Sequence, residues 1–321
     1  MTEYTMKLIG TVAVSFLITA LGGTAFIPFL RRLRCGQTVR SDGPVSHLKK
    51  EGTPTMGGIL ILLGAFAAAA LSFREFPQTA VVLLFMAGFG GIGFLDDYIK
   101  VVCHRSLGLL AWQKLLLQLL VTAGFAYYLE KILSVSLAMK IPGTQGLWLD
   151  FGKGNLLLFF LIVLGTVNGV NLTDGLDGLA GSVTAIVAVF FTVLAIGKGS
   201  EIAAAGCAVV GALFGFLLFN AHPASVFMGD TGSLALGGFV AVYGYLLKMP
   251  LYIAIVGVIY LVETISVIAQ VVYFKLSGGK KLLKMAPLHH HLELSGWSER
   301  KIVFLFTMIT ALMCLLAIMQ G

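Results

Sequence analysis

Five aspartates in three short segments are the side chains best suited to chemistry in this sequence. Asp96 and Asp97 are adjacent, Asp174 and Asp177 lie three residues apart, and Asp230 follows a Met-Gly pair. Each segment adjoins the end of a long apolar run, and we expect all three ends at one face of a membrane. Unpaired carboxylates repel one another unless a cation holds them, and an all-oxygen donor set favours Mg²⁺ or Mn²⁺. The pattern predicts a metal-assisted site, although each aspartate taken singly fits a solvated helix end.

Two of these aspartates continue a polar series with a spacing of three: Asn168, Asn171, Asp174 and Asp177. On a helix, neighbours in such a series lie about 60° apart, so one unbroken helix cannot aim all four at one ligand. The glycines Gly175 and Gly178 predict a helix break in this segment. Asp177 would then lie near the start of the next helix, where capping and ligand contact are equally open.

Three consecutive histidines, His289, His290 and His291, make up half of the six histidines in the chain. Consecutive residues on a helix point about 100° apart, so a helix could not direct all three at one metal ion. We expect a loop that aims them at a phosphate or uses one as an acid or base. Lys49 and Lys50, beside a Gly-Thr-Pro turn, fit a phosphate contact or a simple topology signal.

The elements that must position these residues are membrane-spanning helices. Of the 321 residues, 58% are hydrophobic and only 12% are charged, and apolar runs of about 20 residues recur along the chain. We therefore predict an all-α polytopic membrane protein with about ten transmembrane helices in a single integral membrane domain, 1–321. The predicted spans are 8–30, 56–72, 79–95, 112–130, 155–171, 179–197, 202–219, 231–247, 251–274 and 301–319.

Charge placement predicts the orientation. Of the 22 Lys and Arg residues, 15 follow the odd-numbered spans, so those loops are predicted to be cytoplasmic and both termini extracytoplasmic. The net charge of +7 could suggest nucleic acid, but we exclude that partner because the basic residues lie in loops between spans. Glu263 lies inside the ninth predicted span, about 18 Å along it, and is either functional or protonated and bonded to a neighbouring helix. The 39 glycines favour close helix packing over ligand contact.

Five segments, in order along the whole chain, resemble the polyprenyl-phosphate N-acetylhexosamine-1-phosphate transferase superfamily, and within it the phospho-N-acetylmuramoyl-pentapeptide transferase family. They are 52–58 (GTPTMGG), 96–100 (DDYIK), 171–180 (NLTDGLDGLA), 227–232 (FMGDTG) and 286–293 (APLHHHLE). The resemblance implies ten transmembrane helices in the bacterial plasma membrane, a cytoplasmic active site and a homodimer. It also implies transfer of phospho-MurNAc-pentapeptide from UDP-MurNAc-pentapeptide to undecaprenyl phosphate, which gives lipid I and UMP in peptidoglycan synthesis and requires Mg²⁺.

The resemblance also implies roles for individual residues. The implied catalytic residues are Asp96, Asp97, Asp230 and His290, with Mg²⁺ held by Asp230 and Asp97. The implied substrate-binding residues are Lys50, Lys114, Asn171, Asp174, Asp177, Asn220, Phe227, His289 and His291. An aspartate would deprotonate the lipid phosphate for direct attack, and a covalent route through a carboxylate is the rival.

Two other functions compete with this one. The first is a sister enzyme that transfers GlcNAc-1-phosphate to a polyprenyl phosphate. The histidine run and the segment 296–299 (GWSE) that follows it argue against this function. The second is an ion-coupled transporter, whose binding acids would lie near the bilayer midplane. Only Glu263 lies there in the predicted topology, while the other candidate acids gather at one surface.

Overall fold

The protein is a bundle of helices, seen in a computed structural model that describes residues 3–33, 50, 52–71, 73, 75–103, 105, 107–144 and 146–319. The predicted spans correspond to these helices: α1 Glu3–Arg32, α3 Gly58–Ala70, α4 Pro77–Val101, α5 Ala111–Tyr127, α6 Gly154–Thr173, α7 Leu179–Gly197, α8 Ala203–Asn220, α9 Gly229–Leu246, α11 Val258–Leu276 and α13 Glu299–Met319. The other elements among the described residues are the π-helical turn η1 Tyr128–Ile132, the strands β1 Met139–Lys140 and β2 Trp148–Leu149, and the short helices α10 Tyr252–Val256 and α12 Leu288–Glu293.

Among the described residues, eight helices are long and apolar enough to cross a membrane: α1, α4, α5 with η1, α6, α7, α8, α11 and α13. The fold prediction of an all-α polytopic membrane protein is therefore confirmed. The remaining two predicted spans are α3, which is apolar but has only 13 residues, and α9, whose 18 residues are almost all buried. A helix enclosed by other helices needs no lipid-facing apolar surface, so α9 is central to the bundle and not at its edge.

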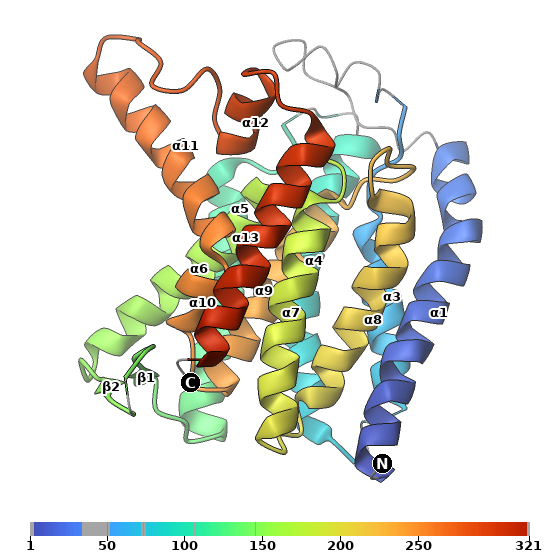
Figure 1. The fold of residues 1–321 in the computed structure, drawn as a ribbon, viewed down its shortest axis with the longest axis vertical. Coiled ribbons are helices and arrows are strands. Elements are labelled where there is room, and N and C mark those ends of the chain that lie inside the picture. The colour runs from blue at the N-terminus through green and yellow to red at the C-terminus, as the bar shows by residue number, and fades with distance from the viewer. Residues whose placement is uncertain are drawn as a thin grey trace.

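Both chain ends lie at one end of the bundle, together with the small β1–β2 hairpin (Figure 1). The C-terminal ends of α4 and α6 and the N-terminal ends of α9 and α13 lie at the opposite end, near α12 (Figure 1). The predicted placement of both termini on the same side agrees with this arrangement. All the aspartates singled out above therefore gather at one end, as expected, and the compartment that this end faces stays a prediction.

Helix α9 approaches its neighbours closely because glycines remove side chains from the contacts. Gly93 of α4 lies against the backbone of Asp230, Gly232 of α9 lies against Gly58 of α3, and Gly237 of α9 lies against the α6 backbone. A methyl group at any of these positions would overlap backbone atoms. The prediction that the span glycines serve close packing is confirmed for these contacts. This packing holds the start of α9 against the end of α4.

The ninth predicted span, 251–274, is wrong as one continuous helix. The chain forms α10, breaks at Gly257, and starts α11 at Val258. Glu263 is therefore only about 8 Å along α11, not 18 Å along a longer helix. The side chain of Glu263 is fully buried. In Figure 1, α11 leans away from the rest of the bundle toward the end where the aspartates gather.

Candidate active site

Asp96, Asp97 and Asp230 form a compact group that we call the aspartate triad. Asp96 and Asp97 lie in the last turns of α4, and Asp230 lies in the first turn of α9. One carboxylate oxygen from each residue lies within 4.8 Å of the others. The sequence prediction that these three aspartates converge is confirmed. The predicted span 79–95 ends too early, since α4 continues through Asp96 and Asp97 to Val101.

Asp97 caps the first turn of α9 from a neighbouring helix. Its Oδ1 accepts the backbone N–H of Asp230 at 3.1 Å, and its Oδ2 accepts the N–H of Thr231 at 2.9 Å and its hydroxyl at 2.6 Å. A carboxylate at a helix N-terminus pairs with unsatisfied N–H groups and with the positive end of the helix dipole. The preceding Gly229 has φ +74, and a Cβ there would crowd Oδ2 of Asp97. Glycine is therefore required at this position.

Two lysines lie among the oxygens of the triad. Lys100 Nζ lies 2.5 Å from Asp96 Oδ2 and 2.8 Å from Asp230 Oδ2, and Lys114 Nζ lies 3.1 Å from the same Asp230 oxygen. The other oxygen of Asp230 accepts the amide of Asn171 at 2.7 Å. Lys114 and Asn171, both expected in the site, thus contact Asp230 directly. The Asp230 side chain is 16% exposed, whereas that of Asp96 is 3% exposed and Asp97 is buried.

These residues fit a hard divalent cation. The donor atoms are carboxylate oxygens, which is the ligand type that Mg²⁺ prefers. Lys100 Nζ bridges Asp96 and Asp230, so a positive charge already lies between two carboxylates. Asp230 is the most accessible member of the triad. The arrangement can therefore hold a cation and an anionic ligand next to each other.

The helix break predicted between the Asn171 and Asp177 positions is confirmed. Helix α6 ends at Thr173, Asp174 follows as its C-cap, and α7 begins after Gly178. Burial, followed by the negative charges of Asp230, Asp97 and Asp177, raises the pKa of Asp174 from its usual 3.8 to about 8. The N-cap of α7 is Gly178, so Asp177 does not cap this helix.

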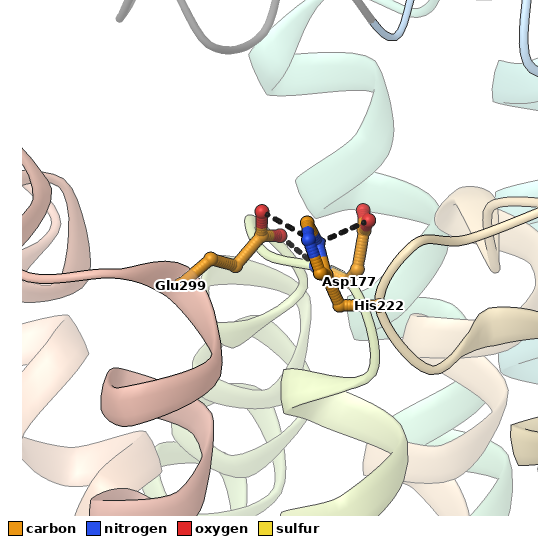
Figure 2. A group of neighbouring side chains, drawn as sticks. All are labelled: Asp177, His222 and Glu299. Atoms are coloured by element: carbon orange, nitrogen blue, oxygen red, sulfur yellow. Dashed lines mark hydrogen bonds and ion pairs between the residues drawn. The ribbon is translucent and has the colours of Figure 1, made fainter.

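Asp177 instead belongs to a second group with His222 and Glu299, which we call the Asp177–Glu299 cluster (Figure 2). Nδ1 of His222 lies 3.1 Å from Asp177 Oδ2 and 3.1 Å from Glu299 Oε2. Lys50 donates to Asp177 Oδ1 and to Glu299 Oε1, both at 2.7 Å. The backbone N–H of Asp177 donates to Glu299 Oε1 at 2.5 Å. The cluster joins the α6–α7 loop, the α8–α9 loop, the start of α13 and Lys50.

The histidine run forms the short helix α12, so the prediction of a loop there is wrong. As the 100° spacing requires, the three rings have different partners. His289 is buried beside Glu263, His290 Nδ1 lies 2.9 Å from Glu293 Oε2, and His291 Nδ1 accepts the N–H of Lys284 at 3.1 Å. His289 reaches the break after α6, where its ring lies against Gly175.

Two further predicted residues lie in the loop between α8 and α9. Asn220 is buried, and its amide donates to the carbonyl of Val226 at 2.9 Å, so it holds the loop. Phe227 is partly buried, and its backbone N–H donates to the carbonyl of Pro54 at 2.8 Å. Lys49, expected to contact phosphate together with Lys50, lies outside the described residues.

Sequence reasoning missed Lys100, His222 and Glu299 as members of the site. Lys100 follows Asp96 by one helical turn, a spacing that favours an ion pair on a helix and could have identified it. Glu299 was noted only as part of the segment after the histidines. His222 gave no signal, because its partners lie 45 and 77 positions away in the chain. Contacts over such separations follow only from the packing of α7, α8 and α13.

Fold and site together define a class: polytopic α-helical membrane proteins with a carboxylate- and lysine-rich site at one end of the bundle. Comparison with known proteins identifies the family. Residues 79–248, more than half of the chain, match the model described as "Glycosyl transferase family 4", and residues 50–62 match phospho-N-acetylmuramoyl-pentapeptide-transferase signature 1. The triad and the α6–α7 break lie inside the first match, and Lys50 lies inside the second.

Curated relatives named phospho-N-acetylmuramoyl-pentapeptide-transferase are similar over nearly the full length. One from Geobacillus sp. (strain WCH70) is 49% identical over 312 residues, 96% of this chain and 95% of the relative. One from Clostridium kluyveri is 45% identical over 98% of this chain and 99% of the relative, and one from Clostridioides difficile is 46% identical over 96% of each. The chain belongs to the phospho-N-acetylmuramoyl-pentapeptide-transferase family, as the sequence resemblance predicted.

Proposed function

We propose that this protein transfers phospho-MurNAc-pentapeptide from UDP-MurNAc-pentapeptide to undecaprenyl phosphate, giving lipid I and UMP for peptidoglycan synthesis. The observation that carries the proposal is the aspartate triad with two lysines among its oxygens, in a chain that belongs to this family. Phosphoryl transfer depends mainly on positioning and on neutralisation of phosphate charge. Carboxylates for a divalent cation and two ammonium groups beside them supply both.

The triad residues take different roles in this proposal. Asp230, the most accessible of the three, and Asp97 would hold Mg²⁺, which when bound neutralises charge on the diphosphate. Asp97 already accepts three hydrogen bonds from α9, so both of its oxygens have partners. Asp96 is therefore the better base for the lipid phosphate, since it accepts one backbone N–H, that of Leu109, where Asp97 accepts two N–H groups and a hydroxyl. Lys100 and Lys114 would contact the phosphates, and His290 would assist the transfer.

The nucleotide sugar would bind around the α6–α7 break. Asn171, next to Asp230, and Asp174, at the end of α6, line the path between the triad and the Asp177–Glu299 cluster. Phe227 would stack on the uracil. The remaining expected substrate contacts are Lys50, Asp177, Asn220, His289 and His291.

The experiment is a substrate comparison on purified protein in detergent. With Mg²⁺ and undecaprenyl phosphate present, we expect UMP release and lipid-linked product from UDP-MurNAc-pentapeptide. UDP-GlcNAc, offered in parallel, should give neither. Turnover of UDP-GlcNAc alone would assign the chain to GlcNAc-1-phosphate transfer, and absence of UMP release with both sugars would favour transport.

The proposal extends to placement and assembly. We place the protein in the bacterial plasma membrane with the triad facing the cytoplasm, as a homodimer. A cysteine introduced at exposed Glu130, near the β1–β2 hairpin, should react with a membrane-impermeant thiol reagent on whole cells. Protection there, with labelling only after lysis, would reverse the orientation. Mass determination in detergent by light scattering tests the dimer.

A further inference from the structure

Glu263 and His289 form a buried pair of side chains. The proposed reaction gives a role to His289 but none to Glu263. Both side chains are shielded from solvent, Glu263 on α11 and His289 on α12. Oε1 of Glu263 accepts the backbone N–H of His289 at 3.3 Å. Oε2 lies 3.2 Å from Nδ1 of the same residue, within ion-pair range but without hydrogen-bond alignment. One carboxylate therefore contacts both the backbone and the ring of one histidine.

The opposite edge of the His289 ring faces the segment that joins α6 to α7. Nε2 lies against the Cα of Gly175, so closely that a Cβ at this position would overlap the ring. Nε2 has no hydrogen-bond partner among the described residues. A buried polar atom without a partner is costly, and such atoms in native structures call for an explanation. Gly175 directly follows Asp174, so an unpaired ring nitrogen points at the segment expected to contact the nucleotide sugar.

We propose that Glu263 is a positioning residue that orients His289, so that Nε2 supports the Asp174–Gly175 segment and completes the binding site for the nucleotide sugar. The inference rests on the proposed function. The negative charge of a carboxylate 3.2 Å from Nδ1 favours the tautomer that carries its proton on Nδ1, and the bond from the His289 backbone to the same carboxylate fixes which edge of the ring faces Gly175. Second partners of this kind fix ring orientation and tautomer in histidine sites generally.

A purely structural pair would have a different signature. If Glu263 only fastened α12 to α11, its loss would lower stability and leave substrate affinity unchanged in the folded fraction. If it orients His289, its loss weakens nucleotide-sugar binding specifically, because only that substrate meets the Asp174–Gly175 segment. The KM for undecaprenyl phosphate then stays the same. The split between the two KM values therefore separates positioning from support.

The test uses Glu263→Gln in the full-length protein. The amide can present an N–H to Nδ1, which moves the ring proton to Nε2 without a change in size. We expect the KM for UDP-MurNAc-pentapeptide to rise about tenfold, with the KM for undecaprenyl phosphate unchanged. The matched control is Tyr260→Phe, one turn away on α11, which removes a buried hydrogen bond of 2.8 Å to Thr184. It should lower the melting temperature and leave both KM values unchanged.

A double-mutant cycle provides the second readout. Addition of Glu263→Gln to His289→Gln should cause no further rise in KM, because the residue to be oriented is already gone. Gly175→Ala should give the same KM change from the other side of the ring, with Glu263 intact. If Glu263→Gln does not fold, Glu263→Asp replaces it, and a smaller rise in the same KM is expected.

Equal effects on both KM values, or full additivity with His289→Gln, would overturn the inference. Titration of UMP into the purified protein separates this failure from failure of the proposed function. Tighter UMP binding to wild type than to Glu263→Gln supports the inference even if no lipid-linked product forms. Equal UMP binding by the two proteins, with an active wild type, contradicts the inference alone.

Discussion

The aspartate triad and the Asp177–Glu299 cluster each contain a lysine between two carboxylates, yet they are built differently. The triad uses two helices, α4 and α9, in backbone contact through Gly93, and its donor atoms are oxygens only. The cluster draws on two loops, the start of α13 and Lys50, and it contains the imidazole of His222. Its carboxylates are already bridged by Lys50 at 2.7 Å on both sides.

This difference indicates that the aspartate triad is better suited to bind a metal ion and that the Asp177–Glu299 cluster is better suited to support the structure. In the triad, Asp230 is more accessible than its neighbours, and its two lysines come from α4 and α5. In the cluster, the two carboxylates share one lysine and one imidazole, and the backbone N–H of Asp177 also donates to Glu299. The imidazole between its carboxylates offers nitrogen in place of the oxygen that Mg²⁺ prefers, so the cluster is better suited to structural support.

Removal of divalent metal should have the largest effect. Treatment with EDTA is expected to abolish UMP release, and Mg²⁺ should restore it. Mg²⁺ should also raise the melting temperature of wild type and of Glu299→Gln, because a ligand that binds only the folded state stabilises it. It should not do so for Asp230→Asn. The reverse pattern in a thermal-shift assay would assign the ion to the Asp177–Glu299 cluster.

The Asp230→Asn variant should lower kcat by about a thousandfold, because removal of one charged ligand costs several kcal/mol of transition-state stabilisation. Its melting temperature without metal should stay close to that of wild type. UMP release measured at saturating substrate tests this, with Asp150→Asn at the opposite end as the matched control. A fall of tenfold or less in kcat would remove Asp230 from the metal site.

The Glu299→Gln variant should act mainly on stability and nucleotide affinity. Glu299 contacts Lys50, His222 and the backbone of Asp177, so its neutralisation should destabilise the fold by about 1–3 kcal/mol. We expect a lower melting temperature and a KM for UDP-MurNAc-pentapeptide raised up to about tenfold. Exposed Glu130→Gln is the control. A loss of kcat as large as that in Asp230→Asn would show that the two groups do not differ in role.

A pH dependence of stability should appear at Asp174, which lies near charged residues of both groups. Its folded pKa of about 8 lies above the ordinary value of 3.8, so the folded state holds a proton that the unfolded state releases between these pH values. The free energy of unfolding of wild type therefore falls as pH rises through this interval. Asp174→Asn lacks this contribution, so its melting temperature relative to wild type should increase from pH 5 to pH 8. A constant difference would contradict the raised pKa.

Much of the fold followed from apolar runs of the right length. The break after Thr173 followed from glycines within a polar series, and the convergence of three aspartates followed from their common place at span ends. The break at Gly257 could not be predicted in this way, because an apolar run has the same composition whether it forms one helix or two. The burial of α9 also left no clear signal, since enclosure by other helices is a property of packing.

The site was predictable where chemistry is local in sequence and hidden where it is not. Asp96 and Asp97 can be recognised in the sequence as an adjacent pair, and Asn171 and Asp174 lie in one short motif. His222 and Glu299 meet Asp177 only because α8 and α13 both pack near α7, and a lone histidine or glutamate in a loop is ordinary. The helical conformation of the histidine run was missed because proline and consecutive histidines gave no apolar period to read.

Close contact between Gly93 and the backbone of Asp230 has a consequence for how this site tolerates change. The spacing of the triad is set by two main chains in contact, and not by side-chain rotamers that could readjust. A single added methyl group at residue 93, which never touches a substrate, would push Asp230 away from Asp96 and Asp97. The position of Asp230 relative to Asp96 and Asp97 therefore depends on the absence of a side chain at residue 93, where α4 and α9 are in contact.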